Sequence, residues 1–325
     1  VTKVMTMLLI MEAVDRGQLS LDDKVTISER AASMGGSQMY MEPGEQHTLE
    51  TLMIGIAIAS ANDACVAAAE HHSGSVEIFV ENMNKRAAEL GMKNTHFVNT
   101  NGLPVADHYT SAYDIALMSK ELVKHEKIRD WFSIWMTNVT LGLPNKKQTE
   151  LGLTNTNRLI RTYPGANGIK TGFTQEAGYC LSASATRGDL TLIAVIMGSP
   201  KSQTRFAEAA KLLDYGFANF DSVKLAEKGE PLGMVVIEKG MPNLINAVAP
   251  EDISVLVKKG EKDTVKGELA YKDAIAAPIS KGDQVGELVV YQKDAEIARY
   301  PIVAEEDVKK ASLLQIYLRL LKNLA

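Results

Sequence analysis

The sequence pattern changes near residue 220, and this change divides any fold of the chain into two parts. Before it, apolar residues recur at helical spacing in six segments: 4–17, 49–59, 62–71, 76–91, 111–125 and 203–217. After it, short β-type runs such as 232–237, 253–257 and 285–291 alternate with charged turns that contain glycine. We therefore predict two domains in this chain of 325 residues: an α+β domain over 1–220 and a small all-β domain over 221–303.

Two β-type runs follow the tripeptide Lys170-Thr171-Gly172 and predict a hairpin that turns near 187–189. With the preceding helices, this hairpin indicates helices packed on an antiparallel sheet. On an exposed strand edge, the lysine would attract a carboxylate, and the glycine would let the backbone of a ligand approach. The alternative is an ordinary strand next to a turn, with its lysine in solvent.

Composition and charge exclude several classes of function. The formal net charge is −5, so nothing favours nucleic acid as a partner. The two cysteines, Cys65 and Cys180, lack the spacing of metal ligands, and the six histidines form no His-Glu-x-x-His pattern. We therefore expect no metal site and no cofactor. No run reaches the roughly 18 apolar residues of a membrane span.

The segment 304–325 combines apolar and basic residues and predicts a terminal amphipathic helix. Its apolar residues include Val308, Leu314 and Leu321, and its basic residues include Lys309 and Arg319. A helix of this kind can lie in a membrane interface, or it can dock on its own domain or on a partner. Its position beyond a completed β domain favours the membrane.

Two further elements carry groups suited to catalysis. Ser60-Ala61-Asn62 offers a hydroxyl, which can relay a proton, and an amide, which can hold a carbonyl or a lysine. The competing interpretation is that Ser60 and Asn62 cap a helix. Lys3 lies on the first helix and can act as a base if burial or nearby positive charge lowers its pKa. A residue three positions earlier would share the face of Lys3, and that position lies before Val1.

Together these elements resemble the three motifs of the penicilloyl-serine transferases: Ser-x-x-Lys, Ser-x-Asn and Lys-Thr-Gly. Here they read x-Val1-Thr2-Lys3, Ser60-Ala61-Asn62 and Lys170-Thr171-Gly172. The surrounding segments 36–40, 91–97 and 205–209 are similar to those of D-alanyl-D-alanine carboxypeptidases of the S11 type, the low-molecular-weight penicillin-binding proteins. The resemblance covers about 1–220, and the β domain and tail match the usual layout of that family. It implies a β-lactamase/transpeptidase-like fold for the first domain.

The resemblance also implies a role for each matched residue. In that family, a serine attacks the penultimate D-Ala carbonyl of a peptidoglycan stem peptide, and water then hydrolyses the acyl-enzyme. Lys3 would take the serine proton, Ser60 would relay it to the leaving amine, and Asn62 would hold the substrate and Lys3. On the opposite wall, Lys170 would supply positive potential and Gly172 would leave room for the substrate.

Three more roles concern the ends of the scissile peptide. Thr171 and Arg205 would hold the terminal carboxylate, and the backbone N–H of Phe173 would form the oxyanion hole with that of the serine. The implied partners are the peptidoglycan pentapeptide as substrate, β-lactam antibiotics as inhibitors, and a membrane surface bound by the terminal helix. The implied location is the extracytoplasmic face of the bacterial cell membrane.

The nucleophile itself is expected immediately before Val1. Either an upstream segment is missing from the sequence, or the serine is present there as a modified residue; the chain as written would bind substrate but not become acylated. Two other functions stay open at this point. A β-lactamase would need an added carboxylate base, for which the sequence offers no clear candidate, and a binding module without activity would lack the serine altogether.

Overall fold

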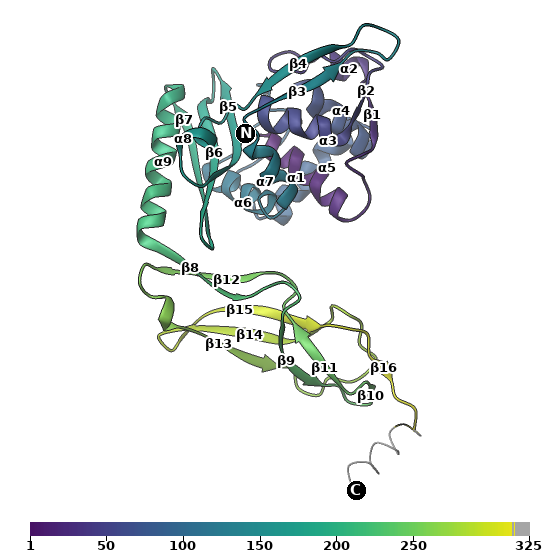
Figure 1. Cartoon of the computed structure of the whole chain (residues 1–325), viewed down its shortest axis with the longest axis vertical. Coiled ribbons are helices and arrows are strands. Elements are labelled where there is room, and N and C mark those ends of the chain that lie inside the picture. Colours follow the sequence, from purple (N-terminus) through teal and green to yellow (C-terminus); the bar gives the residue numbers. More distant parts are fainter. Residues whose placement is uncertain (314, 316–325) are drawn as a thin grey trace. The chain divides into compact units, whose positions relative to one another are not determined.

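The computed structural model describes residues 1–313 and 315, which form two compact units that divide between Gly216 and Phe217. Figure 1 follows the chain through both units. The first unit combines helices with an antiparallel sheet, and the second consists mainly of strands. The predicted α+β class with an all-β C-terminal domain is confirmed.

The helices of the first unit include a central apolar one. They are α1 (Lys3–Asp15), α2 (Glu29–Ala32), α3 (Leu49–Ile54), η1 (Gly55–Ala59), α4 (Asn62–Ser73), α5 (Val76–Glu89), α6 (Ala112–Leu122), α7 (Glu126–Ser133), α8 (Leu159–Thr162) and α9 (Ser202–Asn219), which runs across the division between the units. Helix α1 is apolar on all sides and contacts α4, α5, α6 and strand β5, so it lies in the core.

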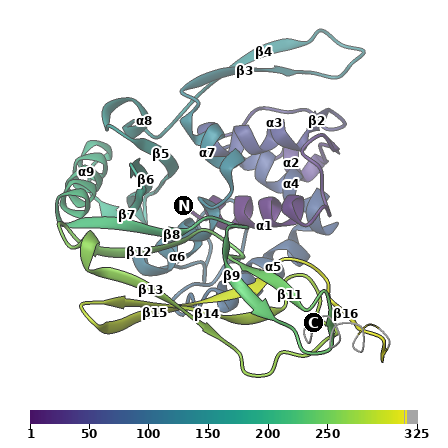
Figure 2. The same ribbon diagram turned by 60° about the horizontal axis from the view of Figure 1, so that its bottom comes forward.

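The strands of the first unit form three small sheets. They are β1 (Lys24–Thr26), β2 (Gln46–Thr48), β3 (Met136–Leu141), β4 (Thr149–Thr154), β5 (Ala166–Thr174), β6 (Gly178–Arg187) and β7 (Leu190–Ser199). Strands β5, β6 and β7 pair in that order, all antiparallel, and the turn at residues 188–189 agrees with the predicted hairpin. Figure 2 shows β3 and β4 as an extended hairpin that projects from the rest of this unit.

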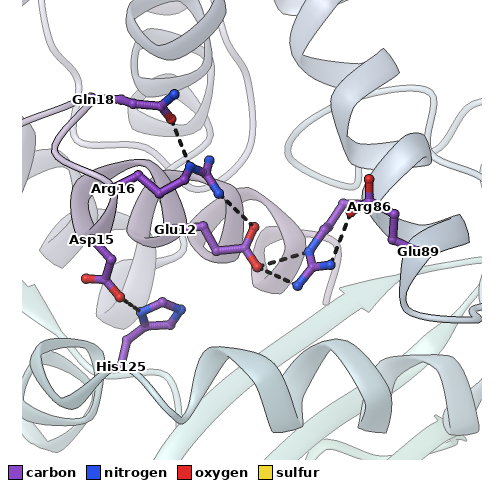
Figure 3. Close-up of polar contacts among 7 residues, drawn as sticks. All are labelled: Glu12, Asp15, Arg16, Gln18, Arg86, Glu89 and His125. Atoms are coloured by element: carbon purple, nitrogen blue, oxygen red, sulfur yellow. Dashed lines mark hydrogen bonds and ion pairs between the residues drawn. The ribbon is translucent and has the colours of Figure 1, made fainter. Parts of the chain in front are cut away.

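A polar network fixes the carboxyl end of α1 (Figure 3). The Glu12 carboxylate forms an ion pair with the guanidinium of Arg86 on α5, with 2.7 Å between nitrogen and oxygen. Its second oxygen lies 4.0 Å from the guanidinium of Arg16. Arg86 also pairs with Glu89 at 3.1 Å, and Asp15 pairs with His125, which precedes α7, at 2.7 Å. These contacts join α1 to two neighbouring helical segments, so the orientation of its other end is set by polar contacts as well as by core packing.

The second unit contains strands β8 (Phe220–Ala226), β9 (Pro231–Val236), β10 (Gly240–Met241), β11 (Leu244–Val248), β12 (Ile253–Lys258), β13 (Val265–Tyr271), β14 (Gln284–Gln292), β15 (Ala295–Ala304) and β16 (Lys309–Lys310), with the short helix η2 (Lys262–Thr264). The main sheet has the order β13-β14-β15-β11-β9, and β12 pairs with β8. Ile253, Val255 and Val257 alternate with exposed residues along β12, as expected for a sheet with one buried face.

The predicted start of a helix at residue 304 is wrong. Ala304 ends β15, and Lys309–Lys310 form β16, which pairs with β10. Val308 and Ala311 are buried in the second unit, so these apolar residues belong to the core of the β domain. The rest of the predicted helix lies mostly outside the described residues. Within the described part of the chain, no helix has the length and apolar character needed to cross a membrane.

Candidate active site

A cleft of about 710 Å³ in the first unit is lined by all eight residues singled out from the sequence. These are Lys3, Ser60, Asn62, Lys170, Thr171, Gly172, Phe173 and Arg205. They come from α1, the junction of η1 with α4, strand β5 and α9, which lie far apart in the sequence. Figure 1 marks the amino terminus between the β5-β6-β7 sheet and the helices, which is where these elements meet.

Lys3 lies in the first turn of α1 and is almost completely buried. Its ammonium group donates hydrogen bonds to Asn62 Oδ1 at 2.7 Å and to the backbone oxygen of Asn101 at 2.7 Å. Burial lowers the pKa of Lys3, against a smaller opposing effect of the groups at Cys65 and Asp63. Burial therefore makes the neutral amine, which is the form that accepts a proton, easier to reach than for a lysine in water.

Ser60 is not the N-cap of α4. It ends the π-helix η1 in the left-handed conformation, with φ 64° and ψ 33°, and the residue at the N-cap of α4 is Ala61, which makes no side-chain capping bond. A non-glycine residue in this conformation is strained, and π-helical turns often occur at functional sites. The side chain of Ser60 instead lines the cleft. The capping interpretation of this serine is therefore excluded.

Asn62 and Asp63 hold the loop before β2 against the cleft. Asn62 donates from Nδ2 to the backbone oxygen of Gly35 at 2.7 Å, and the Asp63 carboxylate accepts the N–H of Met39 at 2.9 Å. A Cβ atom on Gly36 would lie 2.8 Å from Asn62 Nδ2, and Gly36 has a φ of +80°, so this position requires glycine. The amide of Asn62 thus has a fixed orientation, with its oxygen toward Lys3.

Lys170 is buried, with 1% of its surface exposed, which rules out the alternative of a lysine in solvent. Burial, followed by the positive charges of Lys3 and Arg205, lowers the pKa of Lys170 to about 7. Two lysines that are both buried in one cleft oppose each other's protonation. An anion in the cleft would reduce this repulsion.

Thr171 and Arg205 are neighbours of Lys170 on the same wall. Thr171 Oγ1 donates to Thr156 Oγ1 at 2.7 Å, while Arg205 Nη1 donates to the backbone oxygens of Gly172 at 2.9 Å and Cys180 at 3.1 Å. Arg205 is 7% exposed, and its buried Nε has no hydrogen-bond partner among the described residues. A buried donor without a partner is costly, so a ligand oxygen near this guanidinium would be stabilising.

The amino end of α1 meets β5 in the interior of the cleft. A Cβ atom on Gly172 would lie 2.7 Å from the nitrogen of Val1, so the close approach depends on glycine at this position. A residue bonded to this nitrogen would begin beside Gly172 and share a helix face with Lys3.

Phe173 contributes a wall at the mouth of the cleft. Its ring is 54% exposed and lies against Tyr179, with 4.3 Å between the ring centroids. The side chain of Phe173 therefore contributes an apolar surface, and only its backbone offers a polar group. The predicted role of its backbone N–H in an oxyanion hole stays a prediction.

Sequence reasoning missed three residues that position the first turn of α1 and the wall opposite it. The backbone oxygen of Asn101 binds Lys3, and Thr156 binds Thr171. His108 lies 2.8 Å from Thr2 Oγ1 through Nε2 and accepts the N–H of Val98 at Nδ1. Burial is the main cause that lowers the pKa of His108 to about 4. Asn101 and His108 belong to none of the three motifs, so the sequence offered no signal for either residue.

No group of three or more metal-binding side chains occurs among the residues that the structure describes. The site combines the buried amine of Lys3, the hydroxyl of Ser60 on a strained backbone, and a wall that carries the cationic groups of Lys170 and Arg205. Such a set suits transfer of a proton at a neutral pH and binding of a carboxylate next to the reacting group.

Comparisons with known proteins agree in both units. Residues 1–201 match the peptidase S11 family, described as D-alanyl-D-alanine carboxypeptidase, and residues 220–310 match the C-terminal domain of penicillin-binding protein 5. The chain is 48% identical over 315 residues to the D-alanyl-D-alanine carboxypeptidase DacF of Bacillus subtilis, covering 96% of this chain and 80% of that protein.

Solved structures give the same result. Penicillin binding protein 5 from Haemophilus influenzae is 33% identical, with a TM-score of 0.72 over 95% of this chain and 89% of its own. The Streptomyces K15 DD-transpeptidase is 30% identical, with a TM-score of 0.62 over 67% of this chain and 86% of its own.

We expect Lys170→Met to stabilise the protein most at low pH. The pKa of Lys170 is about 7 in the folded chain and 10.5 in the unfolded chain, so between these values the unfolded chain binds more protons and the folded chain gains stability as the pH rises. Removing the lysine should therefore raise the melting temperature at pH 6.5 and have a smaller effect at pH 10. The exposed Lys85→Met is the control. An equal effect of Lys170→Met at both pH values would contradict the low pKa.

Proposed function

This chain belongs to the S11 peptidase family of D-alanyl-D-alanine carboxypeptidases, and on that premise we propose how its cleft carries out the reaction. The protein is a serine-type enzyme that removes the terminal D-Ala from peptidoglycan stem peptides through an acyl-enzyme, and β-lactams inhibit it. One observation carries the proposed mechanism: the buried Lys3 amine and the amino end of α1 face the Lys170-Thr171-Gly172 strand across one cleft.

The proposed nucleophile is a serine bonded to the nitrogen of Val1, three positions before Lys3. It would lie beside Gly172, because a Cβ atom on that glycine would come within 2.7 Å of the nitrogen of Val1. Its hydroxyl and the amine of Lys3 would share one face of the first helical turn. This is the arrangement of a nucleophile next to its base.

Acylation begins when Lys3, as a neutral amine, takes the serine proton while the serine oxygen attacks the penultimate D-Ala carbonyl. Burial keeps the pKa of Lys3 low, and Asn62 and Asn101 hold its nitrogen in place through their oxygens. The tetrahedral intermediate then collapses, and the C–N bond to the terminal D-Ala breaks. Ser60 delivers the proton from Lys3 to the departing amine, from its position at the end of η1.

The opposite wall positions the substrate. Thr171 and Arg205 hold the terminal carboxylate, for which the unpartnered Nε of Arg205 is the supporting observation. Lys170 adds positive potential, and the bound carboxylate in turn favours the charged form of this lysine. The backbone N–H groups of Phe173 and of the serine stabilise the oxyanion, where loss of one donor typically costs about 2.7–4 kcal/mol.

Water completes the cycle by attacking the ester of the acyl-enzyme. Lys3 is again the base for this step, since it returns to the neutral form once its proton has left with the amine. The ester C–O bond breaks, the serine regains its proton, and the shortened peptide dissociates. A β-lactam enters the same route at the acylation step, because its carboxylate and amide resemble the peptide end.

The test of this mechanism is Lys3→Met in the enzyme that carries the serine before Val1. Release of D-Ala from an acyl-D-Ala-D-Ala peptide should fall by about 10²–10⁴-fold, the range typical of a lost general base. The rate of the unchanged enzyme should also decline at acid pH as Lys3 becomes protonated, because only its neutral form accepts a proton. Lys85→Met, which alters an exposed lysine, should keep the original rate. A Lys3→Met enzyme within tenfold of that rate would refute the role of Lys3.

We also propose that the enzyme acts at the extracytoplasmic face of the bacterial cell membrane. The supporting features are a peptidoglycan substrate and the apolar and basic residues of the segment that follows β16. There the enzyme would trim pentapeptides of the cell wall and so contribute to cell shape.

Deleting the residues after Ser312 tests the membrane proposal, because this cut leaves β16 and the core of the β domain intact. The shortened protein should no longer sediment with vesicles that contain anionic lipid, whereas the full chain should. Equal sedimentation of the two proteins would show that this segment is not the anchor.

A further inference from the structure

A second pocket, of about 810 Å³, adjoins the catalytic cleft, and apart from Arg205 its arginines have no part in the mechanism described above. It shares two lining residues with the cleft, Thr156 and Arg205. The other lining residues come from the end of α7, the end of β4, α8 and the start of α9. They are Trp135, Thr154, Asn155, Arg158, Arg161, Thr162, Ser202 and Phe206.

Three guanidinium groups gather at this pocket without a carboxylate to balance them. Its lining contains Arg158, Arg161 and Arg205 and no acidic residue. Within the described part of the chain, neither Arg158 nor Arg161 forms an ion pair with a carboxylate. The charge of Arg158 also contributes to lowering the pKa of Arg205, after burial and against the opposing effects of Cys180 and Tyr179. Like charges held together repel each other, so a bound anion would stabilise this arrangement.

The pocket is also ordered by contacts of its own. The guanidinium of Arg161 lies over the ring of Trp135, 5.2 Å from its centroid, and Trp135 fixes Asn155 through a backbone bond of 2.8 Å. Arg205 is 93% buried, given its 7% exposure, and carries the unpartnered Nε. Guanidinium groups held by an aromatic ring and by the backbone are well suited to bind a carboxylate.

The position of the pocket relative to the catalytic cleft indicates which carboxylate it binds. Thr156 accepts the hydrogen bond of Thr171, and Arg205 lines both spaces, so the pocket continues the cleft beyond the residues proposed to hold the terminal carboxylate. It therefore lies on the side where the terminal D-Ala leaves and from which a peptide end can enter.

We propose that the pocket formed by Arg158, Arg161 and Arg205 is a second carboxylate site on the leaving-group side of the cleft. It binds the carboxylate of a free D-amino acid or of an incoming peptide end. The proposal rests on the proposed function for the identity of that carboxylate. Because Arg158 and Arg161 stand apart from the reacting atoms, they would affect capture and release and not the chemical steps.

The experiment compares the double variant Arg158→Gln/Arg161→Gln with Arg30→Gln in the full chain. Arg30 is a matched control, because it is an exposed arginine on α2 whose ion pair partner is Glu77. Calorimetric titration with D-alanine should give a dissociation constant that rises roughly fivefold to tenfold in the double variant and is unchanged in the control. The difference should shrink as salt is added, since exposed charges are screened.

Kinetics then distinguish the two sources of the carboxylate. A rise in the inhibition constant of D-alanine alone assigns the pocket to the product, and a rise in KM for the peptide alone assigns it to the incoming substrate; either supports the site if kcat is unchanged. If the double variant matches Arg30→Gln in the titration and in KM, the second site does not exist. Absence of any D-Ala release by the unchanged enzyme would instead defeat the proposed function, while the titration would still decide on the pocket.

Discussion

Two lysine side chains, those of Lys3 and Lys170, are buried in one cleft, and the chemistry of the site depends on this burial. An ionised amine without solvent costs several kcal/mol unless it is paired or loses its proton. Lys3 has only neutral oxygens as partners, those of Asn62 and Asn101, so burial favours its neutral form. Burial and the charge of Lys3 also lower the pKa of Lys170, to about 7. In the proposed mechanism, Lys3 is the base and Lys170 supplies positive potential on the opposite wall.

The scaffold keeps both lysines in place at some cost in local strain. Helix α1 is held by apolar packing along its length and by the Glu12, Arg86 and His125 contacts at its far end, so its first turn is presented to the cleft as a rigid element. Around it, Ser60 adopts a left-handed conformation, while Gly36 and Gly172 occupy positions that a Cβ atom would obstruct. The strained backbone of Ser60 persists because surrounding contacts determine the structure, and it lies next to the reacting groups.

Much of this site follows from the sequence, because its residues belong to local motifs. The hairpin after Lys170-Thr171-Gly172 and the two-domain division rest on turn residues and apolar spacing, and both are seen in the structure. The π-helix at Gly55–Ala59 does not follow, since its apolar residues fit ordinary helical spacing equally well. The role of His108 could not be foreseen either, because its contact with Thr2 joins positions 106 residues apart. In the segment after β15, the spacing of Val308 and Ala311 fits a helix, but both residues are buried in the second unit. Tertiary packing therefore extends the β domain beyond residue 303, where the sequence predicted its end.

In the proposed mechanism, a serine bonded to Val1 is acylated in the cleft between Lys3 and the Lys170-Thr171-Gly172 strand. Mass spectrometry of the enzyme with this serine, digested after exposure to a β-lactam, tests it most directly. We expect one added β-lactam per chain, on the peptide that contains the serine, Val1, Thr2 and Lys3, and no adduct when that serine is replaced by alanine. An adduct on Ser60, or no adduct on either serine, would refute acylation at the serine before Val1.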